Sequence, residues 1–224
     1  MKLTTGQKIA LDLIAKSPIT NKFYWTGGTL LAYYYFQHRK SEDLDFFTKE
    51  EFSFDEVNQF VQNLKGKAGF KSVEYQKIFD RHKFLLKNKE ILKVEFVYYN
   101  HHRNTLGRRK KVLGVWADSL KDIAANKTLA YFDRNEPKDL FDIYFLLTKG
   151  RFTSKQLLGL VFKKFGVKLP ESLFWSESFK NIKLLFTIKP LLLEKNNKEQ
   201  MRLLNTIDNY FKDQSAQFLR DTLS

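Results

Sequence analysis

Residues 23–47 of the chain read FYWTGGTLLAYYYFQHRKSEDLDFF. The aromatic run at 23–25 predicts a short buried strand, because aromatic side chains suit the half-buried surface of a sheet. The strand ends at Gly27 and Gly28, and residues 29–37 have the composition of a helix. The order strand, glycine turn, helix lets the backbone approach a phosphate group, which free N–H groups at a helix N-terminus can bind. Two glycines also occur in turns that only connect two elements, so the turn alone leaves both interpretations open.

The same stretch ends in an acidic strand. Residues 43–47 (DLDFF) alternate, so Asp43 and Asp45 lie on one side of the strand and Leu44 and Phe46 on the other. Two carboxylates that converge on one place repel each other unless a cation lies between them, and Mg²⁺ or Mn²⁺ accepts such oxygen ligands. The alternative is a half-buried strand whose outer face is merely polar. Acidic residues are depleted in strands, which favours the metal site.

A third acid lies in the clearest strand of the sequence, residues 91–99 (ILKVEFVYY). Glu95 and Lys93 share one face of this strand, opposite an apolar face. If the strands that carry Asp45 and Glu95 are neighbours, the three acids line one site and can hold two metal ions, which would activate an attacking oxygen and stabilise a leaving pyrophosphate. A salt bridge from Glu95 to Lys93 or to another lysine is the alternative, and the sequence does not choose between them.

The chain changes character after Trp116. Up to that point mixed patterns predict an α/β domain over residues 1–115, and helical periodicity then predicts a helical domain over residues 116–224, so the fold class is α+β. Thr4 and Gln7 have the spacing of a capping box at the first helix. The expected helices are 4–16, 29–37, 54–64, 120–133, 138–148, 154–165, 178–186 and 198–223; the expected strands are 23–25, 43–47, 73–78, 82–86 and 91–99.

The helical half carries a second set of charged residues. Lys127 and Arg134 share one helical face and can present two positive charges to a triphosphate. Asp139 and Asp142 share a face of the next helix. Acids in a first helical turn are also favoured by the helix dipole, and Lys138 with Asp142 is an ordinary i, i+4 pair, so a structural role is the alternative.

Composition restricts the possible ligands and the environment. The 224 residues carry a formal net charge of +14, which favours polyanions such as nucleic acid or nucleotides, although lysine also serves as a general solubiliser. There is no cysteine, which excludes disulfides and thiolate metal sites. Asp12 and Lys16 interrupt the N-terminal apolar stretch, and no run of about 18 apolar residues occurs, so we expect neither a signal peptide nor a membrane span and place the protein in the cytoplasm.

A basic stretch follows the strand at 91–99, where an RNA backbone is a suitable ligand because phosphates are recognised by clustered lysine and arginine. An exposed run of this kind is also often only a solvated loop. The candidate RNA-binding residues are Arg103, Arg108, Arg109, Lys110 and Lys111.

Three segments, GGTLLAYYYFQHRKSEDLDFF (27–47), LKVEFV (92–97) and NKTLAYFDRNEPKDLFDIYFLL (126–147), resemble the nucleotidyl transferase AbiEii/AbiGii toxin family of the DNA polymerase β-like nucleotidyltransferase superfamily. The resemblance implies a mixed sheet with flanking helices followed by a helical C-terminal region, with NTP and Mg²⁺ as ligands. Some members are toxins of toxin–antitoxin or phage-defence systems, and some add nucleotides to the acceptor end of tRNA.

The resemblance also assigns site residues. Gly27, Gly28 and Thr29 match the glycine motif, Ser41, Asp43 and Asp45 match the serine–aspartate motif, Lys127 matches the family lysine, and Asp139 and Asp142 match its RDxxD element. The chain departs from the pattern at Lys138, where an arginine is usual and bidentate contacts are lost. It departs also at Gly28, where the wider superfamily more often has serine, and at Glu95, where many relatives have aspartate.

The leading hypothesis is an enzyme that moves an NMP from an NTP to a hydroxyl group, with RNA, and tRNA in particular, as the acceptor and a cognate antitoxin as partner if the chain is a toxin. A small-molecule or protein acceptor is the second hypothesis, and a basic nucleic-acid-binding module without catalysis is the third. The expected catalytic residues are Asp43, Asp45, Lys127 and Asp139; the metal ligands Asp43, Asp45 and Glu95; the nucleotide-binding residues Gly27, Gly28, Thr29, Ser41, Lys127 and Arg134; and the supporting residues Arg39, Lys138 and Asp142.

Overall fold

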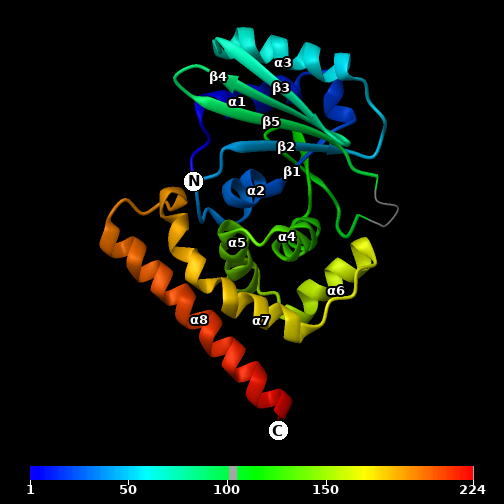
Figure 1. Ribbon diagram of the computed structural model, residues 1–224. Coiled ribbons are helices and arrows are strands. Elements are labelled where there is room, and N and C mark those ends of the chain that lie inside the picture. Colours follow the sequence, from blue (N-terminus) through cyan, green and yellow to red (C-terminus); the bar gives the residue numbers. More distant parts are fainter. Residues whose placement is uncertain (101–104, 224) are drawn as a thin grey trace. The chain divides into compact units, whose positions relative to one another are not determined.

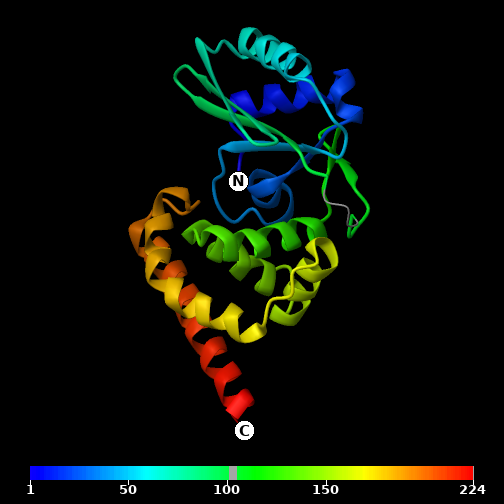
Figure 2. The same cartoon turned by 45° about the vertical axis from the view of Figure 1, so that its right-hand side comes forward.

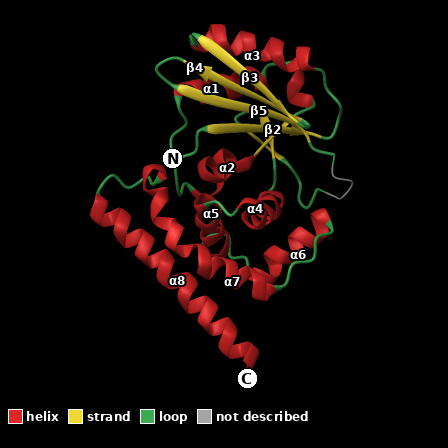
Figure 3. Cartoon of the chain, in the orientation of Figure 1, coloured by secondary structure: helices red, strands yellow, loops and turns green. Residues whose placement is uncertain are grey.

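A computed structural model of the chain describes residues 1–100 and 105–223 (Figure 1). The chain divides into two units. Unit 1 comprises Met1–His102 and Gly107–Leu120, and unit 2 comprises Arg103–Leu106 and Lys121–Ser224. Unit 1 holds the sheet and unit 2 is built from helices, so the predicted α+β class is confirmed (Figure 3).

Unit 1 contains a mixed sheet of seven strands in the order β3-β4-β5-β2-β1-β7-β6. The β2–β5 and β1–β7 pairs are parallel and the other pairs are antiparallel. The strands at the β6 edge were not predicted, because three-residue strands are too short to show alternation. The strands are β1 (Tyr24–Thr26), β2 (Asp43–Thr48), β3 (Ser72–Ile78), β4 (Arg81–Lys87), β5 (Ile91–Tyr98), β6 (Lys110–Val112) and β7 (Val115–Ala117).

Helices α1 (Thr5–Ala15) and α3 (Phe54–Ala68) cover one face of this sheet (Figure 1). The capping box of Thr4 and Gln7 at the start of α1 is confirmed. Beneath the helices, Phe96 packs against the rings of Phe23, Phe46 and Phe60 with centroid separations of 5.1, 5.6 and 5.7 Å. The even-numbered residues of β2 are therefore in the core, and its odd-numbered residues, which include the two aspartates, lie on the other face.

The helix that follows β1 begins earlier than expected. α2 (Gly27–Leu30) starts at the first glycine and continues as the wider π-helix η2 (Leu31–Phe36), which ends at Gln37 with φ +49°. α3 also differs from its prediction, since it runs past Gly66 and ends at Gly69, whose φ of +69° suits a glycine C-cap.

All the regular elements in the described part of unit 2 are helices (Figures 2 and 3). The predicted helix over 178–186 is wrong, because α7 starts after Pro170, and the following segment, with Pro190 near its end, forms a tighter 3₁₀ helix. No helix of the described residues is long and apolar enough to cross a membrane. The elements are α4 (Leu120–Arg134), α5 (Pro137–Thr148), α6 (Ser154–Phe165), α7 (Glu171–Asn181), the 3₁₀ helix η3 (Ile182–Leu191) and α8 (Asn197–Leu223).

Candidate active site

The glycine turn lies directly against one of the two aspartates. Thr26, the last residue of β1, pairs with Asp45 of β2 across the sheet. Gly27 follows with φ +79°, and a Cβ built on it would lie 2.0 Å from Oδ2 of Asp45. Glycine is therefore required at position 27 by its backbone conformation and by the close carboxylate. The predicted order of strand, glycine turn and helix is confirmed.

Hydrogen bonds fix the segment that leads into β2. The Thr29 hydroxyl donates to the backbone carbonyl of Asp43 and lies 2.9 Å from the hydroxyl of Ser41. The Gln7 side-chain amide donates to the carbonyls of Ser41 and Glu42 at 3.0 and 3.1 Å. Thr29 and Ser41, predicted as nucleotide-binding residues, thus position the start of the strand that carries the acids.

The strands that carry Asp45 and Glu95 are neighbours, as the three-acid hypothesis requires. In the parallel β2–β5 pair, Asp43 is opposite Lys93 and Asp45 is opposite Glu95, so all four side chains lie on one face. Nζ of Lys93 lies 2.8 Å from Oδ2 of Asp43 and 2.8 Å from Oε1 of Glu95. Burial alone would lower the pKa of Lys93, but hydrogen bonds to Asp43 and Glu95 outweigh it and raise the pKa to about 12. Lys93 is therefore a cation at neutral pH.

Glu95 is the most enclosed acid of this group. Its side chain is 2% exposed, and while Oε1 faces Lys93, Oε2 lies 2.5 Å from Nη1 of Arg81 on β4. The salt-bridge alternative weighed for Glu95 is therefore present in the structure. Its role as a metal ligand stays a prediction, and both of its oxygens already face cations.

The donor set around Asp43 and Asp45 fits a hard divalent cation. Both carboxylates lie on one face of β2, and the Asp43 side chain is 38% exposed. The hydroxyl of Thr26, opposite Asp45, is buried and has no hydrogen-bond partner within the described residues. Groups of three or more His, Cys, Asp or Glu side chains that could hold a metal do not occur among residues 1–100 and 105–223. Mg²⁺ is commonly held by only one or two carboxylates, with substrate phosphates and water completing its octahedron.

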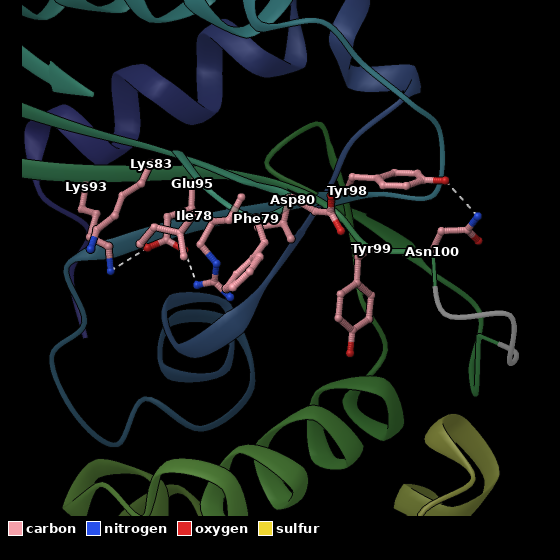
Figure 4. Close-up of a pocket in the computed structure, with 11 residues that line it drawn as sticks. Ile78, Phe79, Asp80, Lys83, Lys93, Glu95, Tyr98, Tyr99 and Asn100 are labelled. Atoms are coloured by element: carbon pink, nitrogen blue, oxygen red, sulfur yellow. Dashed lines mark hydrogen bonds and ion pairs between the residues drawn. The ribbon is translucent and has the colours of Figure 1, made fainter. Parts of the chain in front are cut away.

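A cavity of about 540 Å³ opens beside Glu95 on the same face of the sheet (Figure 4). Its floor is formed by β4 and β5, and its rim by the β3–β4 turn and the residues that end β5. It was not predicted, because it depends on which strands are neighbours. The lining residues used below are Phe79, Asp80, Arg81, Lys83, Lys93 and Glu95.

Four of the charged residues predicted in the helical half meet within unit 2. Lys127 lies 2.7 Å from Asp142 and 3.3 Å from Asp139, and both acids are fully buried. Arg134 binds Asp139 with Nε and Nη2, at 2.7 and 2.8 Å. Lys138 pairs with Glu136 at 2.7 Å, not with Asp142 as the i, i+4 alternative supposed. Asp139 therefore orients both cations, whose contact with a triphosphate stays a prediction.

The residues of the predicted basic stretch have different surroundings in the structure. Arg109 lies with its guanidinium 3.3 Å from the ring centre of Tyr24 and donates to Asp118 at 3.0 Å. Lys110 and Lys111 belong to β6, an edge strand that β1 and β7 separate from β2. Arg108, Lys110 and Lys111 are exposed, and Arg103 lies outside the described residues.

Two further arginines belong to the segments that carry or adjoin the acids, Arg39 ahead of β2 and Arg81 on β4. Arg39 is 2% exposed and donates to the backbone carbonyl of Lys40 at 2.9 Å, which suits its predicted supporting place beside the serine–aspartate segment. Arg81 was missed. The register of β4 against β5 places Lys83 opposite Glu95, and Arg81 two residues earlier on the same face. A prediction that β4 pairs with β5 would have identified Arg81 as a neighbour of Glu95.

A Gly27→Ala variant is expected to unfold at lower urea concentration than the wild type, because it adds a strained φ and a collision with Asp45. Gly69→Ala has the strained φ with nothing within 4 Å of its Cβ, and it should lose only about 1 kcal/mol. Gly66→Ala, in the interior of α3, should be neutral or stabilising. Urea titrations followed by circular dichroism measure the three, and equal losses at positions 27 and 69 would contradict the collision.

Two solved structures share this fold over nearly their whole length. The crystal structure of a candidate nucleotidyltransferase from H. pylori is 19% identical, with a TM-score of 0.58, and the match covers 95% of this chain and 94% of that chain. The crystal structure of JHP933 from Helicobacter pylori matches with the same identity and TM-score and covers 97% and 93%. The fold is that of a nucleotidyltransferase.

The chain belongs to the nucleotidyl transferase AbiEii toxin family, described as a type IV toxin–antitoxin system, whose family model matches residues 9–223. It is also 32% identical over 171 residues to the uncharacterized protein aq_aa25 of Aquifex aeolicus (strain VF5), covering 73% of this chain and 76% of that protein. The match extends over the C-terminal helices, for which the sequence alone offered no motif.

Proposed function

We propose that the chain transfers a nucleoside monophosphate from an NTP to a hydroxyl group of RNA, with Asp43 and Asp45 as the ligands of Mg²⁺ or Mn²⁺. The observation that carries this proposal is the contact between Gly27 and the carboxylate of Asp45. It puts a turn suited to phosphate beside two carboxylates that share one face of β2. A divalent cation held there would neutralise charge on the triphosphate and favour an in-line displacement.

The residues of the chain have distinct tasks in this proposal. The turn at Gly27 and Gly28 lets the backbone come close to the phosphates, and Thr29 with Ser41 keeps the start of β2 in place. Lys93 neutralises Asp43 and Glu95 at neutral pH and so limits the repulsion among the acids. In the helical half, Lys127 and Arg134 would bind the triphosphate, with Asp139 and Asp142 orienting Lys127.

The acceptor is proposed to be RNA because the chain has a net charge of +14 and three exposed basic residues on and beside β6. The family also suggests a cognate antitoxin as a protein partner. The test is to incubate the purified chain with Mg²⁺, each of the four labelled NTPs and total RNA. Label in RNA supports the proposal; label in protein or in a small molecule moves the acceptor to the second hypothesis, and no transfer with any NTP supports a binding module.

The exposed basic residues give a prediction of their own. Replacing Arg108, Lys110 and Lys111 by alanine should weaken RNA binding and flatten the slope of log K against log salt by about 3, because each removes one phosphate contact. Arg109 is left intact, since it holds Asp118 and Tyr24. Anisotropy titrations at several salt concentrations measure the slope, and NTP binding should not change.

The control is a chain that loses the same charge elsewhere, at the exposed Lys67, Lys195 and Lys198. An equal change of slope in both triple variants would mean that only the net charge matters. The basic stretch would then have no specific part in RNA binding.

A further inference from the structure

The turn between β3 and β4 places an aromatic ring where folding gives no reason for one. Phe79 is the first residue of this two-residue turn, has φ +49° and is 90% exposed. Glycine, asparagine and aspartate are the residues that adopt this conformation readily. A phenylalanine here has a strained backbone and leaves a large apolar surface in water, and such positions are typical of ligand contacts.

The ring lies at the cavity of about 540 Å³, whose cations are held in place (Figure 4). The buried carboxylate of Glu95 binds both Arg81, at 2.5 Å, and Lys93, at 2.8 Å. Lys83 is opposite Glu95 on β4 and adds a third cation. The charged side chains that line the cavity are the cations Arg81, Lys83 and Lys93 and the acids Asp80 and Glu95, which leaves an excess of one positive charge within the lining. Lys93 is bound in addition by Asp43, at 2.8 Å, so Arg81 and Lys83 are the cations that remain for a ligand.

The sheet order places this cavity and the glycine turn on opposite sides of the acids. β2 carries Asp43 and Asp45, with β1 and its glycine turn on one side, and β5 and β4 on the other. The register places the cavity floor on the same face as the two aspartates. In an in-line displacement the attacking oxygen approaches from the side opposite the leaving group. If the triphosphate lies over the glycine turn, as the proposed function has it, the cavity is on the side from which the attacking hydroxyl would arrive.

We propose that this cavity receives the terminal nucleotides of a single-stranded RNA acceptor, with a base stacked on Phe79 and the phosphates beside Arg81 and Lys83. The inference rests on the proposed function and names the site where its acceptor binds. Stacking explains the exposed ring, since every base has a face for an aromatic side chain, and Arg81, which Glu95 holds in place, and Lys83 offer positive charge to the phosphates. Arg81 lies opposite Val97, two residues and about 7 Å along β5 from Glu95, which is the length scale of one nucleotide.

The test measures binding of a 5′-labelled single-stranded RNA oligonucleotide by fluorescence anisotropy. Phe79→Asn removes the ring and suits φ +49°, so the hairpin should fold at least as well as in the wild type. We expect its Kd for the oligonucleotide to rise about tenfold, and Phe79→Trp to restore binding. Lys83→Gln should keep the ring contact but reduce the salt slope by about 1. Phe162→Ala, which removes an exposed ring from α6, should bind like the wild type.

Other results distinguish a failure of the cavity as acceptor site from a failure of the proposed function. If the wild type binds the oligonucleotide and Phe79→Asn binds it equally well, the cavity is not the acceptor site, while RNA remains the acceptor. If Phe79→Asn weakens NTP binding instead, the ring contacts the base of the NTP and the inference is overturned. If Phe79→Asn lowers the affinity for a blunt RNA duplex as much as the affinity for the single strand, stacking of an unpaired base on Phe79 is excluded. A wild type that binds no RNA overturns the proposed acceptor itself, whatever the variants do.

Discussion

Asp45→Asn and Asp43→Asn are each expected to lower nucleotide transfer more than tenfold without unfolding the protein. Loss of a metal ligand removes an interaction that stabilises the transition state, and such losses cost several kcal/mol. Each replacement keeps the shape of the side chain, and Asp45→Asn removes one charge from a group of three acids, so its stability should hardly change. Asp43→Asn breaks the partly exposed ion pair with Lys93 and should lose about 1 kcal/mol or less. Asp43→Asn also takes one of two acidic partners from Lys93 and should lower the pKa of that ammonium from about 12.

The measurement is transfer of label from NTP to RNA, with urea unfolding of the same preparations. Glu42→Gln is the matched control, because Glu42 is an exposed acid next to Asp43 whose carbonyl, not its side chain, is bound by Gln7. A variant at position 43 or 45 that keeps more than about a tenth of the activity would rule out that residue as a metal ligand.

Lys127→Met should have the largest effect on stability. Its ammonium pairs with two fully buried acids, and removal of one partner from a buried ion pair costs about 3–5 kcal/mol. The double variant Lys127→Met, Asp142→Leu should recover much of this loss, because an apolar pair can replace a buried ion pair. NTP binding should fall in both variants if Lys127 contacts the triphosphate, whereas RNA binding should not.

Lys138→Met is the control for this prediction. Lys138 pairs with Glu136 in a half-exposed position, and such pairs contribute about 1 kcal/mol or less. Urea titration compares unfolding, and NTP titration by calorimetry compares binding. A double variant that regains stability and binds NTP normally would restrict Lys127 to a structural role.

The part of the site that lies within one stretch of sequence could be predicted, and the part that depends on strand order could not. Alternation along β2 is local, so the common direction of Asp43 and Asp45 followed from the spacing of their residues. Asp45 and Glu95 are neighbours only because β5 pairs with β2, across about 50 intervening residues. The sequence does not determine this pairing, so the three-acid site could be predicted only on the condition that the two strands are adjacent. Arg81 was missed because its position near Glu95 depends on the register between β4 and β5.

Short or irregular elements account for the errors in the fold. β6 and β7 have three residues each. The two lysines of β6 resembled a solvated loop, although lysine is also common on edge strands. The segment Ile182–Leu191 has enough apolar residues to suggest a helix continuing from 178, but it tightens into 3₁₀ geometry. The long periodic helices α6 and α8, in contrast, were close to their predicted limits.

The two glycines of the turn are not equivalent. Gly27 has φ +79° and no room for a methyl group beside Asp45, whereas Gly28 is not among the positive-φ glycines. The first position is thus tied to the carboxylate and has only one acceptable occupant. The second, where the wider superfamily more often has serine, does not require a positive φ. A substitution at position 28 can therefore leave the geometry of the acids in place, whereas one at position 27 cannot, so the two halves of this short motif differ in the changes that they tolerate.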